Sequence, residues 1–379
     1  MSVELELEHK PQRLTHRPIA EIARSVRIDP RISALVPGFD APFFQAGMAG
    51  YSDGAMRLVA RSHGCPYCVT EALLDRILIA NGARGNRRED PEVLARECGG
   101  GDPESNRLAG VDDHPIAGQL IGTDPDEMAT GAALLVGMGY DVIDVNFACP
   151  VKKIKNANRG GHFLRAPDDA IAVLQAVRAA VPATIPTTVK LRRGYSDDPE
   201  LAHAFDEIFA RAYELGYSWA TVHCRTVEQK YAGPSRWEFL RDLTLRYPDR
   251  IVFGSGDVWQ VSDLFAMLEL TGVHAVAVAR GCIGNPWIFR QARDLMAGRA
   301  PRAPELSEQA QVLLAHLDFS VQLHGAYSAS LQMRKFGTKF AQHHPSPAEA
   351  RSAFLRCTSP EEWRTVIARL YAGASDSYR

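Results

Sequence analysis

The stretch VIDVNFACP, residues 142–150, carries the pattern that decides the fold. It begins with a short, largely apolar run, which predicts a strand over Val142–Asn146, and it ends in a cysteine followed by a proline. Strands of parallel sheets are buried on both faces, so they read as nearly continuous apolar runs. Runs of this kind recur along the chain.

Eight such runs lie between residues 43 and 279, and amphipathic helical patterns separate them. The predicted strands are Phe43–Met48, Tyr67–Glu71, Ile116–Ile121, Val142–Asn146, Thr187–Leu191, Trp219–His223, Ile251–Gly254 and Val273–Ala279. Eight strand–helix units in about 260 residues fit the α/β class and a (β/α)8 TIM barrel. An open doubly wound sheet is the alternative. It would normally show GxGxxG after its first strand, whereas residues 47–50 read GMAG.

The chain divides into three predicted parts. Residues 1–38 are a polar N-terminal extension, residues 39–300 the barrel and residues 305–373 a small helical domain. In the last part strand signals stop and apolar residues recur at helical spacing. Ser346 and Ser359 each precede a proline and, three residues on, a glutamate, which predicts two capping boxes. The Gly/Arg/Asp-rich residues 83–113 predict a long surface loop.

Composition excludes several classes of protein. The 379 residues are 46% hydrophobic and 23% charged, which is ordinary for a globular chain. No apolar stretch reaches the roughly 18 residues of a transmembrane helix, and the N-terminus lacks the apolar core of a secretory signal. With 43 Lys and Arg against 45 Asp and Glu, the net charge of −2 argues against a protein that coats polyanions, but it allows a local basic patch.

Seven cysteines, an odd number, are scattered along the chain and do not form a disulfide framework. We therefore expect a reducing, cytoplasmic compartment. Cys65 and Cys68 form a single CxxC, but a zinc site would need a second pair. We interpret them as a structural pair of small apolar residues, with redox or metal chemistry as the alternative. No metal site is predicted.

Polar side chains gather where the predicted strands end. They are Glu71, Gln119, Asn146, Lys190, His223, Asp257 and Arg280. Barrel enzymes hold their chemistry at the carboxyl ends of the strands, so the set favours one shared site more strongly than any member does alone. Glycine-rich loops follow strands seven and eight, where backbone N–H groups can approach a phosphate and Arg280 adds a fixed charge. Loops that merely turn are the structural alternative.

Cys149 lies just outside the end of a predicted strand. A nucleophilic cysteine would need a histidine base and an oxyanion hole, which the sequence does not specify. A metal-binding cysteine would need partners at ligand spacing. A proton donor needs only a thiol held over the substrate. A buried, inert cysteine is the structural alternative, as are a salt-bridged Lys190 and a satisfied His223.

Together these motifs resemble the tRNA-dihydrouridine synthases, FMN-dependent TIM-barrel enzymes with a small C-terminal helical domain. The matching segments are residues 45–53, 70–71, 118–122, 144–154, 189–192, 223–226, 229–233, 256–257, 279–289 and 333–336. Residues 149–153, CPVKK, are most similar to the bacterial B-type branch. The chain departs from the family by small-for-small exchanges at Gly47, Ala148, Cys224, Ser255 and Ala279.

The resemblance implies that FMN binds at the mouth of the barrel and that NADPH reduces it. The implied cofactor-binding residues are Gly47, Met48, Ala49, Gln119, Lys190, His223, Ser255, Gly256, Asp257, Ala279, Arg280 and Gly281. Hydride would pass from the flavin to C6 of a uracil in tRNA, Cys149 would protonate C5, and Asn146 would help to position flavin and substrate. The target uridine would have to leave its stacked environment.

A basic segment permits an RNA partner despite the negative net charge. Residues 151–194 contain nine Lys and Arg against two Asp, a local charge of about +7, and such a cluster can neutralise phosphates. The expected RNA-binding residues are Lys152, Lys153, Lys155, Arg192, Arg334 and Lys335. A solvated basic face is the structural alternative. We expect tRNA as the partner, no membrane association and a monomer.

Two other functions remain open at this point. One is another FMN barrel oxidoreductase of pyrimidine metabolism, similar to dihydroorotate or dihydropyrimidine dehydrogenase. The other is a non-catalytic RNA-binding relative. The helical tail and the basic segment argue against the first, and the presence of Cys149, Asn146, Lys190 and His223 argues against the second.

Overall fold

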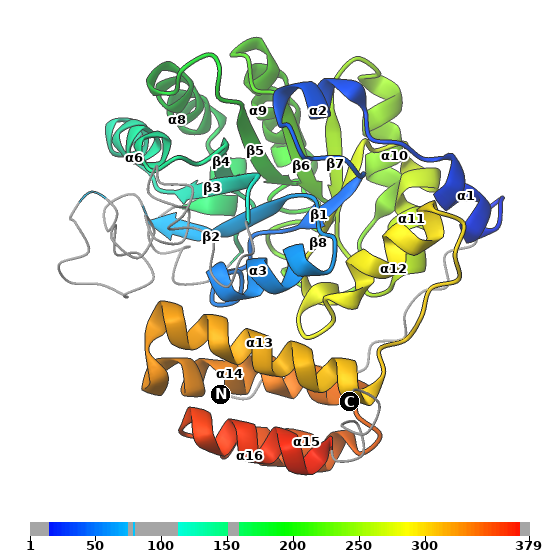
Figure 1. Cartoon of the computed structure of the whole chain (residues 1–379). Coiled ribbons are helices and arrows are strands. Elements are labelled where there is room, and N and C mark those ends of the chain that lie inside the picture. The colour runs from blue at the N-terminus through cyan, green and yellow to red at the C-terminus, as the bar shows by residue number, and fades with distance from the viewer. Residues whose placement is uncertain (1–14, 75–78, 80–112, 151–158, 372–379) are drawn as a thin grey trace.

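The structure is a computed structural model that describes residues 15–74, 79, 113–150 and 159–371. At its centre eight parallel strands form a closed barrel in the order of the sequence (Figure 1). They are β1 (Phe43–Gln45), β2 (Cys68–Leu74), β3 (Ile116–Ile121), β4 (Val142–Phe147), β5 (Thr187–Arg192), β6 (Trp219–His223), β7 (Val252–Ser255) and β8 (Ala275–Val278). The predicted α/β class and TIM-barrel fold are confirmed.

Helices lie between the strands and cover the outside of the barrel. They are α3 (Gly54–Ser62), α6 (Pro125–Gly137), α8 (Pro167–Ala180), α9 (Ala202–Glu214), α10 (Trp237–Arg246), α11 (Val261–Thr271) and α12 (Trp287–Met296), with short 3-10 turns η3 (Gly160–Arg165), η4 (Pro199–Leu201) and η5 (Arg280–Cys282). The start of α6 is explained by Asp124, whose side chain accepts hydrogen bonds from the backbone N–H groups of Asp126 and Glu127, both at 3.0 Å.

Alternation along the strands separates two hydrophobic clusters. On β4, Val145 and Phe147 belong to the large cluster that packs against the helices. Val142 belongs to a second cluster inside the barrel, together with Trp219 and Phe253. Since successive side chains of a strand point to opposite faces, the residues that alternate with the outer ones face the barrel interior.

The described part of the N-terminal extension contributes to this interior. It contains α1 (Ile19–Ser25) and α2 (Pro30–Leu35). Ile32 of α2 and Phe39 belong to the interior cluster, and Phe39 stacks on Tyr67 with ring centroids 4.7 Å apart. Arg17 donates two hydrogen bonds to Glu269 of α11, which ties the start of the chain to the barrel. Residues 15–38 are therefore part of the folded barrel unit, although their sequence is largely polar.

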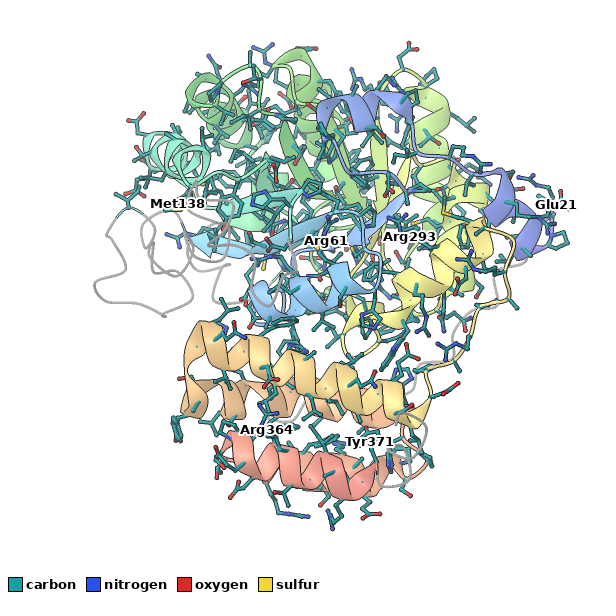
Figure 2. All side chains as sticks on the ribbon, viewed as in Figure 1. Glu21, Arg61, Met138, Arg293, Arg364 and Tyr371 are labelled. Atoms are coloured by element: carbon teal, nitrogen blue, oxygen red, sulfur yellow. The ribbon has the colours of Figure 1, made fainter. Side chains whose placement is uncertain are left out.

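A group of four main helices follows the barrel and packs beneath it in Figure 1. They are α13 (Leu306–His324), α14 (Ala326–Phe340), α15 (Pro347–Phe354) and α16 (Pro360–Leu370), with η6 (Ala341–His343) between α14 and α15. Trp363 is fully buried and stacks on Phe354 at 5.0 Å. On the surface, Arg364 of α16 pairs with Asp318 of α13 (Figure 2).

The two capping boxes predicted for this region are not formed. Ser346 makes no side-chain cap hydrogen bond, and its own N–H instead donates to the imidazole of His344 at 3.0 Å. Ser359 does accept from the N–H of Glu362, but the carboxylate of Glu362 accepts from Thr358 rather than from Ser359. In both cases a neighbouring side chain competes for the group that the box would use.

The turn between α3 and β2 is held by arginines from two helices. Arg61 donates to the carbonyl of Cys65, and Arg293 of α12 donates to the carbonyl of Gly64 (Figure 2). Cys65 and Cys68 are both buried, their sulfur atoms lie 3.9 Å apart, and they form no disulfide. This burial agrees with the structural interpretation of the pair. The predicted loop at residues 83–113 lies outside the described residues except for Asp113. Among the described residues, no helix has the length and hydrophobicity to span a bilayer.

We predict that Phe39→Ala destabilises the protein by about 3–5 kcal/mol, the usual cost of removing a buried aromatic ring. The measurement is urea unfolding followed by tryptophan fluorescence, since Trp219 lies in the same cluster. Leu35→Ala is the matched control, because Leu35 is 43% exposed and its loss should change the free energy of unfolding by no more than about 0.5 kcal/mol. Equal effects of the two substitutions would contradict the role of Phe39 in the core.

Candidate active site

A cavity of about 520 Å³ opens at the carboxyl end of the barrel. This volume lies within the usual range for small-molecule and cofactor sites. The cavity is lined by Cys149 and Asn146 and by all of the predicted cofactor-binding residues except Gly281, which is buried in η5 behind it. The ends of seven strands, which are far apart in the sequence, thus bring these predicted residues to one place.

Strand register explains which of these side chains are neighbours. Asn146 of β4 pairs with Lys190 of β5, and Arg192 of β5 pairs with His223 of β6. His223 in turn pairs with Ser255 of β7. From β5 to β7, the basic side chains of Lys190 and Arg192 are therefore followed by the imidazole of His223 and then by the hydroxyl of Ser255.

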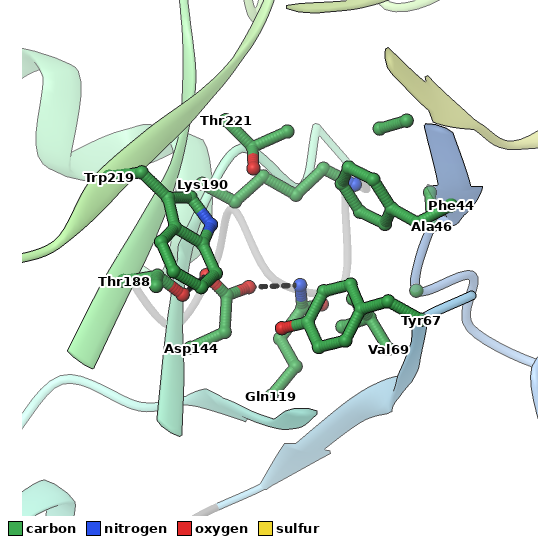
Figure 3. Close-up of a pocket in the computed structure, with 12 residues that line it drawn as sticks. Phe44, Ala46, Tyr67, Val69, Gln119, Asp144, Thr188, Lys190, Trp219 and Thr221 are labelled. Atoms are coloured by element: carbon green, nitrogen blue, oxygen red, sulfur yellow. Dashed lines mark hydrogen bonds between the residues drawn. The ribbon is translucent and has the colours of Figure 1, made fainter. Parts of the chain in front are cut away.

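A buried carboxylate lines a smaller pocket next to the large cavity, and the two share Gln119 and Lys190 among their lining residues. Asp144 accepts hydrogen bonds from Thr188 at 2.6 Å and from the amide nitrogen of Gln119 at 2.7 Å (Figure 3). Because the nitrogen of Gln119 is committed to Asp144, its oxygen faces the other way and accepts from Asn146 at 2.6 Å. The sequence reasoning did not include Asp144 in the site. Asp144 could have been predicted to lie in the site, because it is two residues before Asn146 and therefore on the same face of the strand.

The same chain of hydrogen bonds reaches Cys149. The side-chain oxygen of Asn146 accepts from the backbone N–H groups of Ala148 and Cys149, at 2.9 and 3.0 Å. Arg192 donates to the carbonyl of Ala148 at 2.8 Å, and the N–H of Gly161 donates to the carbonyl of Cys149 at 3.1 Å. The backbone that carries the partly exposed thiol is therefore held from three sides.

Burial shifts the titration of the two charged groups at the centre. Burial raises the pKa of Asp144, although its hydrogen bonds to Thr188 and Gln119 and the charge of Lys190 oppose the rise. Burial likewise lowers the pKa of Lys190, and the charge of Asp144 opposes this. Each group stabilises the charged form of the other.

His223 is partly buried and lies near several positive charges. Burial is the largest cause of a pKa well below the ordinary value, and the charges of Arg192 and Lys190 lower it further. The imidazole is therefore neutral near pH 7. Its Nδ1 accepts from the N–H of Arg225 at 3.2 Å, so the proton lies on Nε2, which can donate.

The loops after β7 and β8 pack in direct backbone contact because they contain glycine. A Cβ on Gly281 would lie 2.2 Å from the carbonyl oxygen of Val258, and one on Gly256 would lie 2.3 Å from the hydroxyl of Ser235. Gly256 and Asp257 have φ of 112° and 56°, and turns in the backbone can form the concavities of N–H groups that bind anions. The carboxylate of Asp257 is held by Arg225, at 2.8 and 2.9 Å. This cradle suits a phosphate.

Arg280 does not simply extend into the cavity. Its guanidinium lies 4.9 Å from the ring of Tyr231 and 4.5 Å from that of Trp259, and 3.7 Å from Asp257. Tyr231 and Trp259 both line the cavity, and the sequence reasoning assigned no role to either. The place of Tyr231 could have been predicted, because it belongs to a segment that resembles the family. The place of Trp259 could not, since the direction of a side chain in a loop does not follow from sequence periodicity.

The structure changes the expected RNA-binding set. Arg192 is 2% exposed and donates to the carbonyls of Ala148, Thr226 and Lys230, so it lies inside the barrel and is not available to a phosphate at the surface. Lys190 is also interior. The local charge of about +7 counted over residues 151–194 is therefore larger than the charge of this segment at the surface. Lys152, Lys153 and Lys155 lie outside the described residues.

The two expected RNA contacts of the helical domain lie on α14. Arg334 donates to the carbonyl of Cys357 at 2.8 Å. Lys335 points toward the barrel, where its ammonium donates to the carbonyl of Gly50. Both side chains are partly buried, so contacts within the protein compete with any contact to RNA.

Comparison with known proteins identifies the family. The sequence profile of dihydrouridine synthase (Dus) matches residues 44–372, which include both the barrel and the helical group. The chain belongs to the dihydrouridine synthase family. It is therefore an enzyme, an oxidoreductase that reduces uridine in tRNA to dihydrouridine, as the resemblance implied. The match argues against both alternatives, the free-pyrimidine oxidoreductase and the non-catalytic relative.

Relatives from several bacteria support this membership over nearly their whole length. A probable tRNA-dihydrouridine synthase of Treponema pallidum is 32% identical, with 86% of this chain and 91% of that protein covered. The tRNA-dihydrouridine synthase B of Xanthomonas campestris is 31% identical, with 83% and 88% covered. A probable tRNA-dihydrouridine synthase of Rickettsia typhi is 28% identical, with 88% and 95% covered.

A solved structure supports the fold. The complex of 2-naphthoyl-CoA reductase with 2-naphthoyl-CoA aligns with a TM-score of 0.50 at 10% sequence identity. The alignment covers 68% of this chain and spans about half the length of the reductase chain. At this identity the likeness concerns the fold alone.

We predict that His223→Asn reduces the loss of stability in acid. Because the pKa of His223 is lowered on folding, the unfolded chain binds more protons below about pH 6.5, so stability falls as the pH drops through that range. Without this group, the slope of unfolding free energy against pH should be shallower by up to about 1.4 kcal/mol per unit below pH 6. Asparagine keeps an acceptor for the N–H of Arg225.

The measurement is urea unfolding between pH 5 and 7.5. His203→Asn is the control, since it removes a histidine that is exposed on α9. Parallel slopes for the wild type and His223→Asn would refute a lowered pKa of His223 in the folded protein.

Proposed function

We propose that this enzyme binds FMN in the 520 Å³ cavity, takes its electrons from NADPH and uses Cys149 as the proton donor to uracil in tRNA. The observation that carries the proposal is the convergence of Cys149, Asn146, Lys190 and His223 on one cavity, next to a glycine-rich anion cradle. Each of these residue types has a distinct task in such a reaction.

The residues fit FMN. Its phosphate would be held by the loops at Ser255–Asp257 and Ala279–Gly281, because both pack tightly and the first has positive φ at Gly256 and Asp257. Lys190 and the neutral His223 lie on the rim between these loops and Cys149. Lys190 supplies the positive charge that stabilises an anionic cofactor, and the Nε2–H of His223 supplies a hydrogen bond without adding charge.

The reduction adds one hydride and one proton across the C5–C6 bond of uracil. The hydride to C6 is the contribution of the reduced flavin. The protein delivers the proton: the Cys149 S–H bond breaks, a bond from C5 to that hydrogen forms, and the thiolate is later reprotonated from solvent. Asn146 and Arg192 bind the peptide that precedes Cys149, and the N–H of Gly161 binds the carbonyl of Cys149, so the thiol is presented in one position.

The tRNA would approach over the mouth of the cavity, with the target uridine turned out of its stack. Lys152, Lys153 and Lys155 follow Cys149 directly in the sequence and are well placed in the chain to meet phosphates beside the reacting base. Arg334 would add a contact from the helical domain at residues 305–373. We propose a monomer acting in the cytoplasm, where tRNA is found and where the cysteines stay reduced.

We predict that Cys149→Ala retains FMN but loses uracil reduction by a factor of about 10² to 10⁴, the usual contribution of a general acid. Flavin retention is read from the visible spectrum of the purified protein. Dihydrouridine is measured by nucleoside mass spectrometry of tRNA incubated with enzyme and NADPH.

Cys357→Ala is the control, because Cys357 is a buried cysteine of the helical group and should not affect the reaction. Full activity of Cys149→Ala would contradict its role as proton donor. A wild-type protein that takes up no flavin would contradict the proposed cofactor.

A further inference from the structure

The loop between β1 and α3, residues 47–53 and here named the β1 loop, forms one wall of the large cavity. Gly47, Met48 and Ala49 line the cavity, and Tyr51 lies at its edge. Except where it leaves the strand, this loop is outside the barrel sheet, so strand pairing does not determine its shape. Its conformation has to be fixed by other contacts, and any loss of order here would alter the cofactor wall directly.

Contacts within the barrel fix part of the loop. The N–H of Gly50 donates to the carboxylate of Glu71, in the middle of β2, at 2.5 Å. The N–H of Met48 donates to the hydroxyl of Ser52 at 2.8 Å. Gly50 has a φ of 77°, which lets the backbone turn so that its N–H and its carbonyl point in different directions.

The carbonyl of Gly50 is held from the helical domain. Lys335 of α14 donates to it through its ammonium, which also lies 5.1 Å from the ring of Tyr51 and 4.9 Å from that of Phe336. The rings of Tyr51 and Phe336 pack edge to face at 5.7 Å. The two polar groups of one glycine are therefore bound by opposite charges from two different parts of the fold.

A second contact ties the far end of the loop to α13. The imidazole of His324 lies 3.0 Å from a carboxylate oxygen of Asp53, and both side chains are buried. The other oxygen of Asp53 accepts from the N–H of Met56 and begins α3. Burial alone would raise the pKa of Asp53, but the hydrogen bond to His324 and the charges of His324, His316 and Lys335 outweigh it, so the pKa is lowered.

We propose that Lys335 and His324 are positioning residues that hold the β1 loop in its flavin-binding shape, so that the helical domain is a structural part of the cofactor site. This inference rests on the proposed binding of FMN in the cavity. It also gives Lys335 a role in holding the β1 loop, whereas the sequence predicted that Lys335 binds RNA. An ammonium bound to a backbone carbonyl and placed between two rings acts on the loop, not on a phosphate.

The test compares Lys335→Met, Lys335→Arg and Arg334→Met. Arg334 is the matched control, since it lies next to Lys335 on the same helix but donates to Cys357, away from the β1 loop. The dissociation constant for FMN is measured by quenching of flavin fluorescence, with no tRNA present. Hydrogen exchange of the peptide that covers residues 47–53 reports the order of the loop independently of activity.

We expect Lys335→Met to weaken FMN binding about tenfold and to speed exchange of the loop, with Lys335→Arg close to the wild type because it keeps a donor. Arg334→Met should bind FMN normally. His324→Gln, which keeps a donor toward Asp53, should bind FMN more tightly than His324→Leu.

Three outcomes would overturn the inference. One is that Lys335→Met binds FMN like the wild type and instead raises the KM for tRNA, which would assign Lys335 to RNA binding. Another is that Arg334→Met weakens FMN binding as much as Lys335→Met does, which would indicate general destabilisation. A wild-type protein that binds no FMN would remove the proposed function as well, whereas the first two results leave that function intact.

Discussion

The site depends on one geometric constraint, the period of two along a β-strand. In a closed barrel one face of every strand looks inward, so residues 144 and 146 of β4 and residues 188, 190 and 192 of β5 must share the interior. The interior is apolar at one end, where Phe39, Trp219 and Phe253 pack, and polar at the other. A shift of β4 by one residue would place Val145 and Phe147 inside and turn the polar residues toward the helices.

Burying polar groups in this way is costly unless each is satisfied. Asp144 meets the requirement with two hydrogen bonds and a nearby positive charge, and its burial makes those contacts stronger than they would be in water. The consequence is orientation. A side-chain amide donates through its nitrogen and accepts through its oxygen. The carboxylate of Asp144 therefore sets the orientation of the Gln119 amide, which sets that of Asn146, which in turn accepts from the backbone N–H of Cys149.

The strands and most cavity residues could be predicted from sequence because strand ends and parity follow from local pattern. The alternation along β5 also predicts that Arg192, two residues after Lys190, points into the barrel. It is therefore not part of a surface patch. Lys335 was harder to assign. Its neighbour Phe336 is buried and its helix is amphipathic, but only the three-dimensional structure reveals that Lys335 of α14 contacts the β1 loop. Trp259 and Tyr231 lie on loops, where no period constrains side-chain direction.

The position of the helical domain follows from barrel closure. The last strand of a closed barrel pairs with the first, as β8 does with β1. A chain that leaves the barrel after β8 and α12 therefore emerges beside the first strand–helix unit, and α13 packs against α3. A Cβ on Gly284 would lie 2.6 Å from the backbone nitrogen of Phe340, so the loop before α12 and the end of α14 are in direct contact. Any domain appended at this end of the chain is brought next to the β1 loop. In this protein that proximity gives the helical domain access to the wall of the cavity, through the contacts of Lys335 with Gly50 and of His324 with Asp53.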